Sequence, residues 1–177
     1  MSRRVPALVV AILAAGCGAP DGAAPTAVGE AVVVEVVDGD TLVVRFGADE
    51  ERLRLIGIDT PESVATDRPD ECFGEEASAH LAQLLPPGTT VQVERDVEPR
   101  DRYDRLLGYV HRTPDHLFVN HELVQSGFAE AKSYPPNTLH EPLFASAESQ
   151  ARTQNQGLWK TCGSPDVPLP PVTDPRP

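Results

Sequence analysis

Two aspartates in the first third of the chain could bind one hard cation. Asp40 ends the turn sequence Asp-Gly-Asp at 38–40, between two β-branched runs, and Asp59 follows a third run that is rich in leucine and isoleucine. The ends of adjacent strands can bring two such carboxylates onto the same ion. Oxygen ligands without a nearby imidazole favour Ca²⁺ or Mg²⁺ over zinc.

Three further side chains complete a constellation suited to a phosphodiester. Glu62 lies three residues past Asp59, on a loop stiffened by proline, where it could take a proton from a water beside the ion. Arg54 and Arg105, together with a divalent cation, would clamp a phosphate whose charge grows during in-line attack. In a regular strand Arg54 and Asp59 point to opposite sides, so their convergence requires a bend or bulge near Gly57.

Each of these pieces has an ordinary structural reading when it is taken alone. Asp-Gly-Asp at 38–40 is also a common hairpin turn, Asp-Thr-Pro-Glu at 59–62 could simply be a proline turn, and a strand arginine commonly faces solvent. The first motif is not an EF-hand loop, because its sixth position is Val43 rather than glycine and its twelfth is Asp49. Only the whole set points to chemistry.

Local patterning predicts the elements that must position these residues. Alternating apolar and β-branched residues predict strands, and amphipathic spacing that ends at proline or glycine predicts helices. The expected strands are 31–37, 41–46, 52–58, 89–95 and 105–111, and the expected helices are 74–85, 119–125 and about 140–156. Five strands with three α-helices, the strands mostly first, predict an α+β domain built on a five-stranded OB-fold β-barrel.

The ends of the 177-residue chain differ from its middle. Residues 1–17 have the pattern of a lipoprotein signal peptide: two arginines, an apolar run too short to span a bilayer, and Leu-Ala-Ala-Gly before Cys17. This end resembles a bacterial lipobox, so we expect Cys17 to carry a lipid that anchors the protein to a membrane outside the cytoplasm. The alternative is an ordinary cleaved signal. A flexible linker at 18–30, a domain at 31–162 and a Pro-rich disordered tail at 163–177 would follow.

Two cysteines remain after the signal. In an oxidising compartment Cys72 and Cys162 are expected to form one disulfide. The alternative is two free, buried thiols.

The motifs occur together in an order and at spacings that resemble the staphylococcal nuclease (thermonuclease) family, over about residues 32–159. The segments that carry the resemblance are 37–41, 54–62, 73–79, 101–109, 119–124 with Gly127, and 157–159. The resemblance implies an OB-fold barrel and Ca²⁺-dependent hydrolysis of DNA and RNA by a monomer, with breakage of the bond to the 5′ oxygen and 3′-phosphate ends.

The resemblance also implies a role for each site residue. Asp40 and Asp59 would bind the metal with their carboxylates, and Thr60 with its backbone carbonyl. Glu62 would be the general base, and Arg54 and Arg105 the phosphate-binding arginines. Tyr103 would contact a substrate phosphate, and Arg102 stands where the family has lysine.

The chain departs from the family pattern in ways that bear on substrate affinity. A second phosphate-contacting tyrosine has no clear match, since Lys132 or Ser133 falls at its place and Tyr134 follows. The loop at 63–71 is acidic, and the net charge of −12 is unfavourable for binding nucleic acid. The competing functional reading is therefore a non-catalytic OB-fold binding module on the cell envelope. The five histidines show no ligand spacing and are expected to be structural or solvated.

Overall fold

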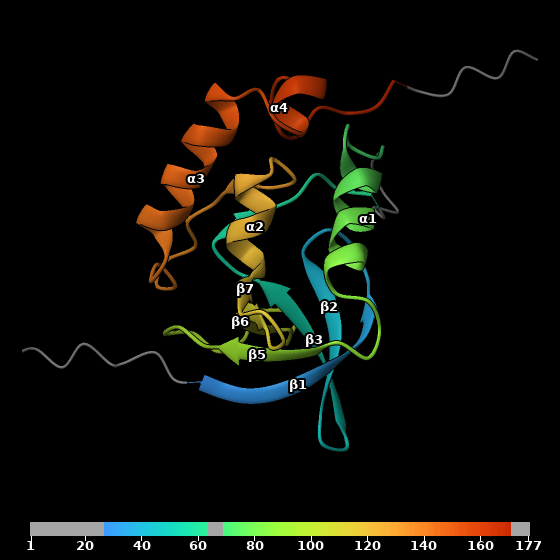
Figure 1. Ribbon diagram of the computed structural model, residues 1–177, viewed down its shortest axis with the longest axis vertical. Coiled ribbons are helices and arrows are strands. Elements are labelled where there is room, and N and C mark those ends of the chain that lie inside the picture. Colours follow the sequence, from blue (N-terminus) through green and yellow to red (C-terminus); the bar gives the residue numbers. More distant parts are fainter. Residues whose placement is uncertain (1–26, 64–68, 171–177) are drawn as a thin grey trace, which may run out of the picture.

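Three antiparallel strands open the fold of residues 27–63 and 69–170, the part of the chain that our computed structural model describes (Figure 1). They are β1 (Ala27–Val36), β2 (Thr41–Phe46) and β3 (Asp49–Leu55), paired in succession. The Asp-Gly-Asp segment forms the turn between β1 and β2, where Val37 N–H donates to the Thr41 carbonyl at 2.9 Å. The predicted hairpin and meander are confirmed.

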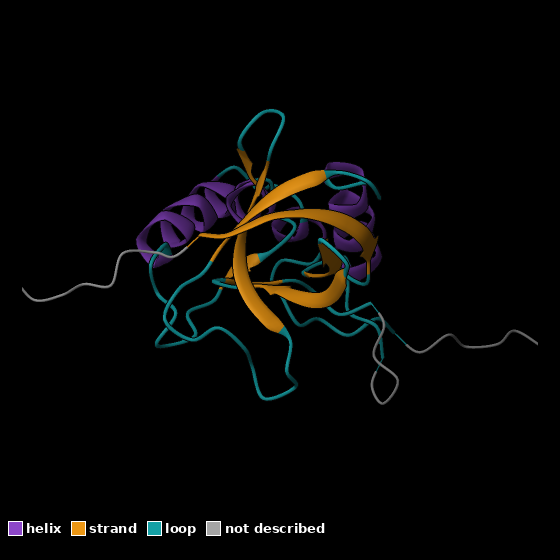
Figure 2. Ribbon diagram, turned by 90° about the horizontal axis from the view of Figure 1, so that it is seen from below, coloured by secondary structure: helices purple, strands orange, loops and turns teal. Residues whose placement is uncertain are grey.

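Two later strands close this meander into a barrel. β5 (Thr90–Glu94) pairs with β1, β6 (Leu106–Arg112) pairs with β5, and β6 returns to pair in parallel with β3. The short β7 (Leu117–Phe118) extends the edge of β6. Figure 2 shows the strands curving around the barrel, with helices behind it on the left and on the right. The architecture is the predicted α+β fold, a closed five-stranded OB-type barrel with helices.

The predicted strand 52–58 is interrupted, and this interruption shapes the site. β3 ends at Leu55, and the chain resumes as the two-residue β4 (Ile58–Asp59), which pairs with β8 (Glu130–Ala131) instead of continuing along the barrel. Gly57 lies between them with a φ of 78°, a conformation that side-chain-bearing residues rarely adopt. A Cβ there would also collide with the ring of Phe144. The bend therefore depends on glycine.

The described part of the chain has four helices, which lie on the barrel. α1 (Gly74–Leu84) and α2 (Val119–Gln125) follow their predicted ranges closely. α3 (Glu141–Thr153) ends three residues before the predicted 156, because Asn155 adopts a φ of 55° and the chain then turns at Gly157 into a further short helix, α4 (Leu158–Thr161). Figure 1 shows all four helices above the β1 and β5 strands.

The core fills the barrel and the space beneath the helices. Its largest fully buried side chains include Tyr109 from β6 and Phe144 from α3, packed with leucine and valine from the strands. A smaller cluster joins Ala151, Leu158 and Trp159 with Phe73 at the start of α1. The last helices are thus docked through apolar contacts, which is the main source of stability for short helices.

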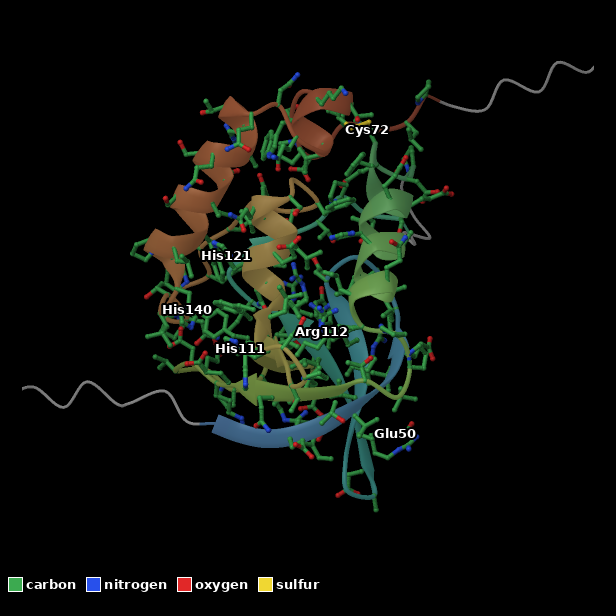
Figure 3. The ribbon with its side chains drawn as sticks, in the orientation of Figure 1. Glu50, Cys72, His111, Arg112, His121 and His140 are labelled. Carbon is green, nitrogen blue, oxygen red and sulfur yellow. A yellow bond between two sulfur atoms is a disulfide. The ribbon has the colours of Figure 1, made fainter. Side chains whose placement is uncertain are left out.

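A disulfide joins Cys72 and Cys162, as the sequence predicts. It links the segment just before α1 to the residue that follows α4. Figure 3 shows the yellow sulfur–sulfur bond at the label of Cys72.

The ends of the domain differ from the boundaries expected from composition. β1 begins at Ala27, inside the segment expected to be linker, because the backbone of Ala27–Glu30 pairs with β5. Residues 163–170 lie against residues 70–72 through backbone hydrogen bonds, which need no apolar periodicity. Cys17 and the expected signal peptide lie outside the described residues. No helix within the described ranges is long and apolar enough to span a membrane.

Candidate active site

One cleft of about 1110 Å³ gathers every residue that the sequence singles out for chemistry. It lies where the turn after β1, the bend after β3 and the loop before β6 meet the segment after β8. The predicted site residues that line it are Asp40, Arg54, Asp59, Thr60, Glu62, Arg102, Tyr103 and Arg105.

The bend at Gly57 brings Arg54 onto both aspartates. One guanidinium nitrogen, Nη2, lies 2.9 Å from Oδ2 of Asp40 and 2.7 Å from Oδ1 of Asp59. The other terminal nitrogen donates to the carbonyl of Ile58 at 3.1 Å and to that of Leu55. The convergence that a regular strand would forbid is therefore built by ending β3 at Leu55 and restarting the chain as β4.

Asp40 is the most enclosed carboxylate of the cleft, with 7% of its surface exposed. Its Oδ2 accepts hydrogen bonds from the backbone and hydroxyl of Thr60 at 3.3 and 3.2 Å. Burial raises the pKa of Asp40 to about 7, with the Asp38 and Asp59 carboxylates adding to the rise and Arg54 opposing it. The cost of burying the carboxylate thus exceeds what the neighbouring guanidinium offsets.

The donor set fits a hard divalent cation. Oxygens of Asp40 and Asp59 approach the same Arg54 nitrogen, so the two carboxylates face a common point. A second positive charge at that point would offset the burial and, with it, the carboxylate repulsion that raise the pKa of Asp40. Within residues 27–63 and 69–170 no cluster of three or more His, Cys, Asp or Glu side chains could hold an ion, so backbone oxygens and water would have to complete the coordination.

Arg105, which also lines the cleft, is held by Asp101. The carboxylate of Asp101 lies 2.7 Å from Nε of Arg105 and also accepts the backbone N–H of Arg105 at 3.0 Å. Burial by itself would raise the pKa of Asp101, but these hydrogen bonds lower it, so the anchor is a carboxylate. Tyr103 is 64% exposed beside it, and its ring lies under the guanidinium of Arg102 at 4.7 Å. Exposed tyrosine and arginine at the rim are available to an incoming anion.

Glu62 is fixed through its backbone by a residue that sequence reasoning did not single out. Glu62 N–H donates to Oε2 of Glu71 at 2.9 Å, and Glu71 N–H donates to the Glu62 carbonyl at 2.8 Å. Glu71 is itself only 8% exposed. The one sequence signal for Glu71 is its position directly before Cys72, because a disulfide at residue 72 restrains the preceding residue.

Lys132 and Tyr134 also belong to the cleft. Because β8 pairs with β4, with Glu130 opposite Asp59, the next residues of the chain pass beside the aspartate. Nζ of Lys132 lies 2.7 Å from Oδ2 of Asp59 and 3.2 Å from Oε1 of Glu130. Tyr134, 43% exposed, lines the same wall. The place that the sequence marks as lacking a tyrosine therefore holds a cation and, two residues on, a tyrosine.

The histidines lie away from this cleft. His111 and His140 both direct Nε2 to the same oxygen of Glu94, at 3.4 and 3.1 Å. Figure 3 shows these two residues and His121 beside α2 and the lower end of α3. None of the residues lining the cleft is a histidine. The titratable side chains that line the cleft, apart from its arginines, are carboxylates, two tyrosines and Lys132.

The fold and the cleft define the class of protein. The closed barrel with its helices is an OB fold, and its cleft sets an aspartate pair against two anchored arginines. The sequence profile described as "Staphylococcal nuclease homologue" matches residues 52–161. The chain belongs to the staphylococcal nuclease family.

Individual relatives support this assignment. The chain is 38% identical over 133 residues to a thermonuclease of Staphylococcus intermedius, covering 75% of this chain and 77% of the relative. It is 35% identical over 127 residues to a thermonuclease of Staphylococcus hyicus, covering 72% and 73%. A third relative, endonuclease YncB of Bacillus subtilis (strain 168), is 34% identical over 132 residues, covering 72% of this chain and 60% of the relative.

Proposed function

We propose that the protein is a Ca²⁺-dependent nuclease that hydrolyses phosphodiester bonds of DNA and RNA and leaves 3′-phosphate ends. The observation that carries the proposal is the meeting of Asp40 and Asp59 at one nitrogen of Arg54, in the cleft that also holds Glu62 and Arg105. Membership of the staphylococcal nuclease family, and relatives named thermonuclease and endonuclease, support it.

The carboxylates of Asp40 and Asp59 and the backbone carbonyl of Thr60 are the proposed metal ligands. When bound, the Ca²⁺ ion supplies positive charge for the scissile phosphate and for the water beside it. The arginines have a separate task. Arg54 and Arg105 stabilise the charge that develops on the non-bridging phosphate oxygens, and their anchoring by carboxylates keeps them oriented before the substrate arrives.

Glu62 is the proposed general base. It accepts a proton from the water that attacks phosphorus in line with the 5′ oxygen, and the bond to that oxygen breaks. Arg102 and Tyr103, at the exposed rim, contact a neighbouring phosphate of the substrate. Because these are contacts to the backbone and not to bases, the site should accept many sequences.

The direct test incubates the purified protein with single-stranded DNA and with RNA, in Ca²⁺, in Mg²⁺ and in chelator. We expect cleavage in Ca²⁺, none in chelator, and little in Mg²⁺, which demands a stricter octahedral shell. The new ends should accept a 5′ label from a kinase and should require phosphatase treatment before a polymerase extends them. Full activity in chelator would contradict the metal assignment, and 5′-phosphate ends would contradict the proposed bond.

A non-catalytic OB-fold binding module is the second candidate, favoured by the net charge of −12. The same assay separates the two, because a module would retain the nucleic acid or a protein partner without shortening any strand. Eight carboxylates line the cleft beside four cations, so net local charge does not favour the nuclease. What favours it is the placement of the cations, with Arg54 between Asp40 and Asp59 and Arg105 held by Asp101.

We also propose that the protein acts outside the cytoplasm, as a monomer held to a membrane by a lipid on Cys17. The support is the lipobox-like sequence before Cys17 and the Cys72–Cys162 disulfide, which suits an oxidising compartment. The mature protein should begin at Cys17, carry acyl mass and partition with membranes, whereas Cys17→Ser should be released or left uncleaved. An unacylated mature N-terminus elsewhere would contradict this.

A further inference from the structure

The segment after the disulfide turns back onto the loop that leads into α1. Cys72 N–H donates to the carbonyl of Val167 at 2.7 Å, and Leu169 N–H donates to the carbonyl of Asp70 at 2.8 Å. Glu71 and Pro168 are paired as an antiparallel bridge between these two bonds. We call residues 164–170 the C-terminal strap. Figure 1 shows the chain leaving α4 and passing beside the start of α1.

The strap is connected to Glu62 by an unbroken series of backbone contacts. It pairs with residues 70–72, whose central member is Glu71. Glu71 in turn holds Glu62 at both backbone groups: its carboxylate accepts Glu62 N–H at 2.9 Å, and its own N–H donates to the Glu62 carbonyl at 2.8 Å. The carbonyl of Glu71 also accepts Gly74 N–H at 3.0 Å, which ties the segment to the first turn of α1.

Two independent ties therefore fix residues 70–72. The disulfide holds Cys72 to Cys162 through side chains, and the strap holds Asp70 and Cys72 through main-chain hydrogen bonds. The disulfide joins the chain at one point and leaves rotation about it, whereas a pair of flanking backbone bonds also fixes the direction of the segment. The strap thus orients Glu71, and the disulfide alone does not.

The strap also reaches the cleft. Asp166, with a φ of 56°, is one of the residues that line it. Its charge is one of the causes that raise the pKa of Glu130, after burial, although Lys132 acts in the opposite direction. The charge of Asp166 in the strap therefore acts on Glu130, whose carboxylate shares Lys132 with Asp59.

We propose that the C-terminal strap is a positioning element for the reaction, which holds Glu71 and through it sets the place of Glu62 in the cleft. The inference rests on the proposed function, in which Glu62 accepts the proton. A displacement of about 1 Å in a reacting group can cost on the order of a hundredfold in rate, so a hydrogen-bonded restraint outside the cleft can control turnover.

Two truncations test the strap as a whole. A chain ending at Gly163 keeps both cysteines and loses the strap, and a chain ending at Pro170 loses only residues beyond it. We expect the chain ending at Gly163 to have kcat lowered by about tenfold or more, with KM for DNA changed by less than about threefold, and the chain ending at Pro170 to match the full chain. Equal kcat in all three chains, or a higher kcat without the strap, overturns the proposal.

One hydrogen bond can be removed with a matched control. Leu169→Pro deletes the N–H that donates to Asp70, and Leu169→Ala keeps it while removing the same exposed side chain. We expect the proline variant to lose kcat several-fold and the alanine variant to keep it. Asp166→Asn tests the other role that the geometry allows, since a strap that acted by repelling substrate would give this variant a lower KM and an unchanged kcat, which overturns positioning.

Amide hydrogen exchange separates the strap from the function on which it rests. The Glu62 amide donates to Glu71 whether or not the protein cleaves nucleic acid. In the chain ending at Gly163 the amides of Glu62 and Cys72 should exchange at least about tenfold faster than in the full chain, with core amides of β6 unchanged. Inactivity of the full chain would refute the nuclease and leave this exchange result intact, whereas unchanged exchange at Glu62 refutes the strap.

Discussion

The ammonium group of Lys132 lies 2.7 Å from one oxygen of Asp59, and the guanidinium of Arg54 lies 2.7 Å from the other. Both oxygens of a proposed metal ligand are thus engaged by cations of the protein itself. The hydrogen bond to Asp59 raises the pKa of Lys132, so its ammonium form is retained at neutral pH. A divalent ion that binds at Asp59 must share this carboxylate with Lys132 or displace it.

Lys132→Met is therefore expected to tighten Ca²⁺ binding. The lysine side chain is 38% exposed, so solvent screens its contact, and we expect a decrease in Kd of about two- to tenfold. Isothermal titration calorimetry measures this without any assay of activity. Lys132→Arg should keep the wild-type Kd, and Arg102→Gln, which removes a charge that lines the cleft away from Asp59, should change it less. A weaker Kd in Lys132→Met would contradict the competition.

Replacing either anchored arginine by alanine should lower kcat by roughly a hundredfold or more, the scale for losing one preorganised charge contact in a transition state. Arg54→Ala should be less stable than Arg105→Ala. It leaves Asp40 and Asp59 facing each other without the guanidinium that they share. Steady-state kinetics at saturating Ca²⁺ and melting in chelator measure the two effects. Arg45→Ala, which breaks an exposed pair with Glu50, is the control and should change neither by much. An unchanged kcat would remove that arginine from the mechanism.

Glu62→Gln should keep Ca²⁺ affinity and lose most turnover, by roughly 10²–10⁴-fold for a lost general base. Glutamine preserves the backbone hydrogen bonds to Glu71, so the loop should stay in place. Single-turnover cleavage and calorimetric Ca²⁺ titration on the same preparation separate chemistry from binding. If the variant cleaves as fast as the wild type, the base lies elsewhere.

Much of the fold and of the cleft could be predicted because the signals are local. The Asp-Gly-Asp turn and the β-branched runs around it specify the β1–β2 hairpin over a few residues. Arg54 and Asp59 are five residues apart on one segment, so their meeting required only a bend, and Gly57 marks where it falls. Such features depend on a few neighbouring residues, so the sequence alone predicts them.

What could not be predicted depends on pairing between distant segments. Lys132 reaches Asp59 across 73 positions because β8 pairs with β4, two strands too short to show a period. The strap pairs through main-chain groups, so a proline-rich composition without apolar spacing gave no sign of it. Glu71 is held beside Glu62 by contacts that its neighbours Asp70 and Cys72 make with the distant strap, and these contacts cannot be read from the local sequence. Backbone pairing of short segments leaves little trace in side-chain patterns.

Reduction of the Cys72–Cys162 disulfide should lower thermal stability and, modestly, activity. The bond spans 90 positions, and chain-entropy models credit a loop of that size with about 4–5 kcal/mol, although engineered bonds often deliver less. It also holds α4 to the start of α1, next to Glu71. Calorimetry before and after reductant measures the loss, and calcium dependence should not change. A thiol count of two in the protein as secreted, under denaturing conditions, would show that the bond does not form.

His80 should make a contribution to the stability of the domain that is lost in mild acid. Its ring stacks on Phe128 at 3.8 Å, and Nε2 is buried without a hydrogen-bond partner in the described part of the chain. Burial lowers the pKa of His80, and the charge of Glu122 opposes this only in part. Because the folded protein then binds this proton more weakly than the unfolded chain, the stability held above pH of about 6.5 is lost as the pH falls through the lowered pKa. His80→Phe keeps the stack and cannot titrate. Urea unfolding at pH 8, 6.5 and 5 should therefore show a smaller loss of unfolding free energy in the variant than in the wild type, and identical losses in the two proteins would show that His80 does not contribute.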